Sequence, residues 1–183
     1  MDSTVKPAAG RYTGPAIALH WLLALMVVAS LGLGLYMSDL PFSPTRLKFY
    51  NWHKWAGVTI LLLSAARLLW RLRHRPPPNL ALPVWQARAA HTTHLAMYAL
   101  FFIVPLVGWA YSSAAGFPIV WFGVLHLSDF VPVDKALAEA IKPWHERTAL
   151  LLAALVLLHM AAALKHQFID RDGLIDRMRP SRR

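Results

Sequence analysis

Four histidines of this chain lie in or at the ends of long apolar stretches: His20, His53, His145 and His159. An ionisable side chain in such surroundings is costly and usually has a functional partner. His145 and His159 share one predicted helix, "KPWHERTALLLAALVLLHMAAALKH", and stand fourteen positions apart. This spacing corresponds to about four helical turns and roughly 21 Å of rise, which a single metal ion cannot span. The spacing therefore predicts two separate sites, one near each end of the helix.

The segments that carry these histidines are long enough to cross a membrane. Of the 183 residues, 57% are hydrophobic, compared with about 45–50% in soluble domains. Four stretches reach the roughly 20 apolar residues that a bilayer core requires: residues 15–37, 49–70, 94–113 and 144–164. A soluble bundle is a poor alternative, because four such spans leave almost no polar face. We therefore expect an all-α, integral membrane four-helix antiparallel bundle, with residues 1–183 forming a single transmembrane domain.

Three features of the spans and their connections carry further expectations. The first span is longer than the apolar region of a signal peptide and lacks a cleavage-site pattern, so we expect it to remain as an anchor. Residues 134–142, "DKALAEAIK", predict a short separate amphipathic helix at the surface, begun by an Asp134 cap. Pro105 and Gly108 predict a kink in the third span.

The distribution of basic residues predicts the orientation. Of the 19 Lys and Arg residues, 13 lie in the N-terminal segment, in the stretch from Arg67 to the third span or in the C-terminal tail. By the positive-inside rule, we expect both termini of this multi-pass chain to be cytoplasmic. The formal charge of +10 is thus a topology signal with some attraction to anionic lipid. A nucleic-acid partner is not expected, since the short tail mixes acids with bases.

Depth along the spans pairs the four histidines. The first and fourth spans run in opposite directions, so His20 and His159 lie at one level near the cytoplasmic end. His53 and His145 open the second and fourth spans and share the outer level. Two imidazoles on opposing helices can ligate a haem iron from both sides, which suits electron transfer because no ligand changes between oxidation states. The chain has no cysteine, so thioether-linked haem and cysteine-ligated iron–sulfur clusters are excluded, and any haem must be a non-covalent, b-type one.

Other uses of these histidines were weighed against the pairing. Zinc prefers three or four ligands in one tetrahedral site, which pairs about 21 Å apart do not offer. A proton transporter also uses intramembrane histidines but normally adds acidic residues at mid-span, and the four spans have none away from their ends. A lone histidine at a helix end is often only an interfacial hydrogen-bonding group.

Two further residues are candidates for the inner level. Arg67 stands fourteen positions after His53 on the same span and can pair with a haem propionate or a quinone oxygen, or extend to the membrane boundary. His94 can replace a haem ligand or bind a quinone carbonyl. Basic residues around the outer level can neutralise propionates, attract a small anionic donor such as superoxide or contact lipid headgroups; they are Arg46, Lys48, Lys54, Lys142 and Arg147.

Several motifs resemble one known family. "ALHW" in the first span, "WHKWAG" opening the second, "HTTHL" opening the third and "PWHE" followed by "LHMAAALKH" in the fourth resemble the prokaryotic cytochrome b561 family over almost the whole chain. The same core resembles the membrane cytochrome b subunits of formate dehydrogenases and nickel–iron hydrogenases.

The resemblance implies a diheme inner-membrane cytochrome that exchanges electrons with quinone, with ubiquinone as the acceptor. By motif position, His20 and His159 would hold the cytoplasmic-side haem, while His53 and His145 would hold the periplasmic-side haem. Stand-alone members of the family include superoxide oxidases, which implies a superoxide:ubiquinone oxidoreductase. Two alternatives remain: an electron-transfer subunit of a separate dehydrogenase or hydrogenase, which has a protein as its donor, or a non-redox proton transporter that uses histidines. The sequence leaves open the physiological electron donor, the direction of electron flow, the haem potentials, the exact quinone site, the role of His94 and the oligomeric state.

Overall fold

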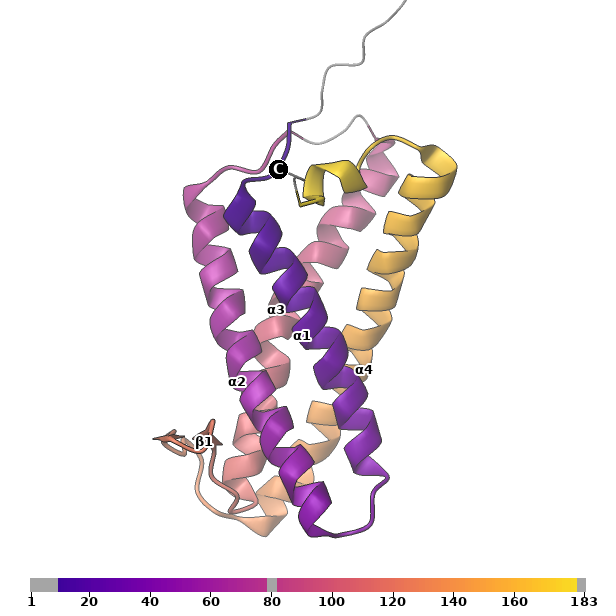
Figure 1. Cartoon of the computed structure of the whole chain (residues 1–183). Coiled ribbons are helices and arrows are strands. Elements are labelled where there is room, and N and C mark those ends of the chain that lie inside the picture. Colours follow the sequence, from indigo (N-terminus) through magenta and orange to yellow (C-terminus); the bar gives the residue numbers. More distant parts are fainter. Residues whose placement is uncertain (1–9, 79–81, 181–183) are drawn as a thin grey trace, which may run out of the picture.

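Four long helices form an antiparallel bundle in the computed structural model, which describes residues 10–78 and 82–180 (Figure 1). The helices are α1 (Gly14–Ser38), α2 (Pro44–Arg73), α3 (Val84–Ala114) and α4 (Lys135–Lys165). All four are long and apolar enough to cross a membrane. The prediction of an all-α membrane bundle is therefore confirmed, apart from one small hairpin.

The helices extend beyond the predicted apolar spans because polar residues continue them past the hydrocarbon core. α2 begins at Pro44, where the Ser43 side chain accepts a hydrogen bond from the Arg46 amide and proline takes the first helical position. α3 begins at Val84, ten residues before the predicted span. The sequence thus located the membrane-crossing parts but not the helix ends.

The helix predicted at residues 134–142 is present with its Asp134 cap, but it is the first part of a longer helix rather than a short one. The Asp134 side chain accepts a hydrogen bond from the Leu137 amide and starts α4, which continues without a break through Pro143 to Lys165. Proline removes one backbone donor within a helix, and nearby groups can compensate for that loss. The extra turns extend α4 beyond the level of His145.

Between α3 and α4, the chain forms a two-stranded antiparallel hairpin instead of a purely helical connection. It consists of β1 (Val120–Trp121) and β2 (Leu125–His126), with Val120 opposite His126. Phe122 and Gly123 have positive φ angles at the turn, as such a tight reversal requires. We call this end of the bundle the hairpin end, and the opposite end, near Gly10 and Pro180, the terminus end.

The interior of the bundle contains few buried residues. Its core cluster consists of Leu23, Val27, Ile60, Met97, Leu100, Phe101 and Leu152. Large apolar side chains remain exposed along the outside of all four helices, such as Leu25, Leu62, Leu95 and Leu157. This distribution suits a bundle whose outer surface contacts lipid rather than water.

The helices do not pack equally against one another. α1 packs closely along α2, α2 along α3 and α3 along α4, whereas α4 has few close backbone approaches to α1 or α2. In Figure 1, α4 passes behind α1 and diverges from α2 toward the terminus end. Side chains on α4 therefore face α1 and α2 across wider gaps than those between the packed pairs.

A cap closes the terminus end. The chain after α4 forms a π-helical turn (His166–Asp170) and a 3-10 turn (Ile175–Met178). The Arg177 side chain, only 5% exposed, donates hydrogen bonds to the carbonyls of Gly10 and Pro78. Trp21 on α1 donates to the Met178 carbonyl. The C-terminal segment is thus held against both the N-terminal segment and the connection between α2 and α3.

Candidate metal sites

At the hairpin end, His53 on α2 and His145 on α4 face each other. Their ring centroids are 6.0 Å apart and the ring planes are inclined by 83°. Two metal–nitrogen bonds of about 2 Å each, together with two ring radii, require a separation of roughly 6 Å. The two imidazoles therefore have the spacing needed for one metal ion between them, across helices that are not closely packed.

Hydrogen bonds orient both of these rings. Nδ1 of His145 lies 3.1 Å from the Val104 carbonyl oxygen. A carbonyl only accepts, so Nδ1 carries the proton and Nε2 of the neutral ring keeps its lone pair for a metal. Nδ1 of His53 lies 3.3 Å from the Ser30 hydroxyl on α1. The hairpin-end pair thus has partners on α1 and α3 in addition to its own helices.

Two glycines create the space that these rings occupy. A Cβ atom added at Gly108 would lie 2.7 Å from Cε1 of His145, and one added at Gly34 would lie 3.2 Å from Cε1 of His53. The first contact is impossible without movement and the second is tight. Glycine is unfavourable in a helix interior, so these positions have a packing reason. From the sequence, Gly108 was assigned only to a helix kink and Gly34 was not singled out, although two glycines at the depth of a predicted ligand pair were a usable signal.

At the terminus end, three imidazoles gather. The ring centroids of His20 on α1 and His159 on α4 are 6.3 Å apart, with the planes inclined by 76°. His94 on α3 lies 5.3 Å from His159 by the same measure. The structure therefore brings the predicted inner pair together and also places His94 against it. Distance alone does not choose between His20 and His94 as the partner of His159.

Arg67 contacts this group directly. Its Nη2 atom lies 3.1 Å from Nδ1 of His20. A guanidinium only donates, so Nδ1 accepts and Nε2 of the neutral ring carries the proton. A metal bound through Nε2 therefore requires Arg67 to leave Nδ1. The hairpin-end pair is prepared for a metal, whereas the terminus-end pair must first rearrange.

A second arginine extends the basic character of the terminus end. The guanidinium carbons of Arg67 and Arg71, one turn apart on α2, lie 5.5 and 5.6 Å from the ring centroid of Tyr98 on α3. Two cations on one aromatic ring near three imidazoles form a site that favours an anionic or carbonyl-bearing group.

Orphaned polar atoms are a further observation that bears on a bound cofactor. Within the described residues, Ser64 Oγ and Trp109 Nε1 are the buried side-chain atoms without a hydrogen-bond partner. Trp109 follows Gly108 at the hairpin-end level, and Ser64 precedes Arg67 by three positions. Such atoms in a native protein call for an explanation. Two imidazole pairs across wide helix gaps, space provided by glycine and an unused donor all fit haem.

The basic residues predicted near the outer level have local partners. Lys48 lies over the Trp52 ring, and Arg147 over that of Trp144. Arg46 lies over the Tyr50 ring and donates to its hydroxyl. Lys54 contacts two backbone carbonyls of the segment before the hairpin. The remaining member, Lys142, lies 3.7 Å from Glu146 in an exposed ion pair and lines a cavity of about 320 Å³.

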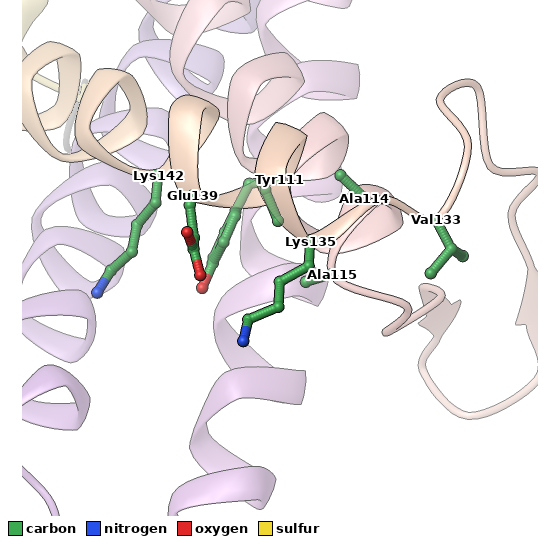
Figure 2. Close-up of a pocket in the computed structure, with 8 residues that line it drawn as sticks. Tyr111, Ala114, Ala115, Val133, Lys135, Glu139 and Lys142 are labelled. Carbon is green, nitrogen blue, oxygen red and sulfur yellow. The ribbon is translucent and has the colours of Figure 1, made fainter.

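This cavity opens between the end of α3 and the start of α4 (Figure 2). Figure 2 shows Tyr111, Lys135, Glu139 and Lys142 extending their polar ends toward the same side. Lys142 precedes His145 by three positions, and Tyr111 follows Gly108 by three. The cavity therefore lies about one helical turn outward from the hairpin-end histidines.

One more group of ligand-type side chains lies beyond α4. His166 Nδ1 is 2.6 Å from an Asp172 carboxylate oxygen and 3.3 Å from one of Asp170. The Lys165 ammonium already pairs with Asp170. We interpret the group as an ion-pair network that ends α4 and begins the cap.

Comparisons with known proteins show the family of the chain. The family model described as prokaryotic cytochrome b561 matches residues 11–181. The chain is 34% identical to cytochrome b561 homolog 2 of Escherichia coli K12, over 92% of this chain and 90% of the relative. It is 31% identical to homolog 1 of the same organism, over 94% and 99%. It is also 28% identical to a probable superoxide oxidase, CybB, of Yersinia pestis, over 94% and 98%. The family model matches nearly the whole length of this four-helix membrane bundle. The chain therefore belongs to the prokaryotic cytochrome b561 family.

Proposed function

We propose that the protein holds two b-type haems, one at each end of the bundle, and carries electrons from a donor at the hairpin end to ubiquinone in the membrane. The observation that carries this proposal is the presence of two imidazole pairs with centroid separations of 6.0 and 6.3 Å, both spanning widely spaced helices. Haem with two imidazole ligands supplies a one-electron couple that needs no change of ligand.

Each ligand pair has its own supporting groups in this proposal. His53 and His145 bind at the hairpin end, with Ser30 and the Val104 carbonyl fixing their rings. His20 and His159 bind at the terminus end, where Arg67 leaves His20 and becomes free to pair with a propionate. Because the first pair is oriented before binding and the second is not, we expect the hairpin-end haem to be retained more tightly.

The orientation of the bundle follows from its basic residues. Thirteen of the 19 Lys and Arg residues belong to the N-terminal segment, the stretch from Arg67 to Arg88 or the C-terminal tail, so we place the terminus end in the cytoplasm of a bacterial inner-membrane protein. The hairpin end then faces the periplasm. The donor meets the chain there, and both chain ends stay inside.

Superoxide is the donor that we propose. The cavity outward from the hairpin-end pair is lined by Lys135, Lys142 and Tyr111 and by a single acidic residue, Glu139, so its lining keeps a net positive charge. Positive charge at a cleft raises the local concentration of a small anion. The relative from Yersinia pestis is named a probable superoxide oxidase, which supports this choice over a protein donor such as a dehydrogenase.

Ubiquinone is the acceptor that we propose, at the terminus end. His94 offers a ring nitrogen near His159, and Arg67 and Arg71 are held over Tyr98 on the adjacent helices. These groups can donate hydrogen bonds to a quinone carbonyl. His94 therefore binds quinone rather than iron in this proposal, which leaves His20 as the partner of His159.

Haem stoichiometry tests the ligand assignment. We expect the purified wild-type protein, expressed with sufficient haem, to contain two haems per chain. His145→Ala and His159→Ala should each contain one, while His94→Ala and the hairpin control His126→Ala should keep two. A wild-type ratio well below two would contradict the proposal, and loss of one haem in His94→Ala would assign His94 as the ligand. The absence of any b-type band in the reduced-minus-oxidised spectrum would favour a transporter.

A rapid-mixing experiment tests donor and acceptor. The oxidised protein in nanodiscs is mixed with an enzymatic superoxide source, with and without ubiquinone, and haem reduction is followed by absorbance. We expect fast reduction that superoxide dismutase abolishes, and reoxidation only when ubiquinone is present. His94→Ala should slow the reoxidation and leave the reduction unchanged. If superoxide does not reduce the haem, a separate dehydrogenase becomes the donor to be sought.

A further inference from the structure

The segment between α3 and α4 is unusually apolar for a connection outside a membrane span. Residues 115–128 contain no Lys, Arg, Asp or Glu. At the tip of the hairpin, Val124 is 88% exposed, Phe122 58% and Leu125 52%. Such a group of exposed apolar side chains marks a surface that contacts something other than water.

The hairpin also packs against the side of α2, closer to the bundle centre than a loop at the helix ends would lie. The Trp121 indole nitrogen is 3.4 Å from the Thr59 hydroxyl, and the rings of Trp55 and Phe122 are 5.5 Å apart. Thr59 stands six positions beyond His53 along α2, which is about 9 Å toward the bundle centre. After leaving α3, the chain therefore turns back along α2, and Figure 1 shows the hairpin beside α2 rather than beyond the helix ends.

The backbone before and within the hairpin is satisfied by side chains of the bundle. Trp55 Nε1 donates to the Val120 carbonyl at 2.6 Å, and Lys54 Nζ lies 3.4 and 3.2 Å from the carbonyls of Phe117 and Pro118. The Ser112 hydroxyl also donates to the Phe117 carbonyl. Non-helical backbone is tolerated at membrane depth only where protein groups satisfy it. These contacts meet that requirement on the side of the hairpin that faces the bundle.

We propose that the hairpin is a re-entrant wedge whose tip inserts at the boundary between the headgroups and the acyl chains of the leaflet at the hairpin end. Three observations select lipid as the occupant: the depth of the contact with Thr59, the absence of Lys, Arg, Asp and Glu over residues 115–128, and the exposed apolar side chain of Leu62, about one helical turn beyond Thr59 on α2. The inserted tip carries a large aromatic and aliphatic surface, which suits the boundary between headgroups and acyl chains. The hairpin thereby anchors the hairpin end of the bundle independently of the helices.

Lys54 has a specific role in this arrangement. Its ammonium group donates hydrogen bonds to the carbonyls of Phe117 and Pro118, in the segment before the hairpin. These bonds stabilise a cation at a depth where an unpaired charge would be costly. It fixes the base of the wedge, whereas Lys48 on the same helix contacts only the Trp52 ring. These two lysines therefore form a matched pair for a test.

The absence of native cysteine permits a direct measurement of depth. Single-cysteine variants Val124→Cys, Leu157→Cys and Glu139→Cys are spin-labelled in nanodiscs of phosphatidylethanolamine and phosphatidylglycerol. Leu157 is an exposed apolar residue of α4, and Glu139 lies at the cavity near the hairpin end. We expect the label at Val124 to collide with oxygen far more than with a water-soluble nickel chelate, as at Leu157. Access of the chelate equal to that at Glu139 would overturn the proposal.

Two further measurements separate lipid from other occupants and test the anchor. A short label-to-label distance between Val124→Cys chains would place a second copy on the hairpin and contradict the lipid assignment. In the Val124→Cys background, Lys54→Met should increase the mobility of the label severalfold, while Lys48→Met should leave it unchanged. Equal mobility in both variants would overturn the role of Lys54. Haem content, measured in parallel, reports whether each variant is folded.

Discussion

At the scale of the residue, the two histidine sites differ in how completely their surroundings are fixed. His145 has its Nδ1 proton directed at a backbone carbonyl and its ring set against Gly108. His20 instead accepts from Arg67. Types and spacing alone predicted which histidines would meet. They could not show which ring nitrogen is free, because that depends on the partner that another helix supplies.

Gly108 allows a direct test of this preorganisation. In Gly108→Ala, the added methyl group would lie 2.7 Å from His145 Cε1, so the ring has to move and we expect the haem content to fall from two per chain toward one. The measurement is the haem-to-protein ratio of the purified variant.

The control for that substitution is Gly32→Ala on α1, where the added Cβ meets nothing within 4 Å. Alanine is favoured over glycine in a helix by about 1 kcal/mol, so both variants gain helix propensity and only Gly108→Ala should lose haem. Two haems in Gly108→Ala would mean that His145 does not need this space.

At the scale of the element, α4 carries histidines of both levels and extends beyond the hairpin-end site. Its first turns, ahead of Pro143, provide Lys135, Glu139 and Lys142 to the cavity. The sequence indicated the Asp134 cap correctly but not the continuity through proline, since a local pattern cannot show whether neighbouring groups compensate for the lost donor. One rigid helix therefore connects the cavity to both candidate sites.

The Asp134 cap tests how far the start of α4 depends on its first hydrogen bond. We expect Asp134→Ala to cost about 1 kcal/mol and to speed hydrogen exchange severalfold in residues 135–142, with no change in residues 150–165. Asp134→Asn keeps an accepting side chain and should exchange like the wild type. Faster exchange along the whole of α4 would show that the cap stabilises the entire helix.

At the scale of the whole molecule, the bundle is closed at the terminus end by a buried arginine and widened where α4 faces α1 and α2. Arg177 joins the N-terminal segment, the α2–α3 connection and the C-terminal turn through backbone carbonyls. These three segments are far apart in the sequence. The cap therefore lies over the end of the bundle that contains His20 and His159.

Replacing Arg177 should open this cap. Each hydrogen bond from a charged group contributes about 1.5–3 kcal/mol, so we expect Arg177→Ala to raise the rate of proteolytic cleavage after residue 170 by at least about tenfold. Arg179→Ala is the matched control, since that side chain is exposed and pairs only with Asp176 in the described part of the chain. Equal cleavage of both variants would mean that other contacts hold the cap.

The sequence by itself determined the four membrane-crossing segments, the histidines that share a level and the family. The first two follow from residue type and helical rise and the family from short motifs, all of which are local properties of the chain. Only the tertiary structure decided that Gly34 and Gly108 make room for the rings of His53 and His145. It also decided that Arg67 donates a hydrogen bond to Nδ1 of His20, and that the loop after α3 turns back along α2. Each of these depends on atoms from different helices meeting in space, because a side chain's partner is set by packing between elements and not by its neighbours in the chain.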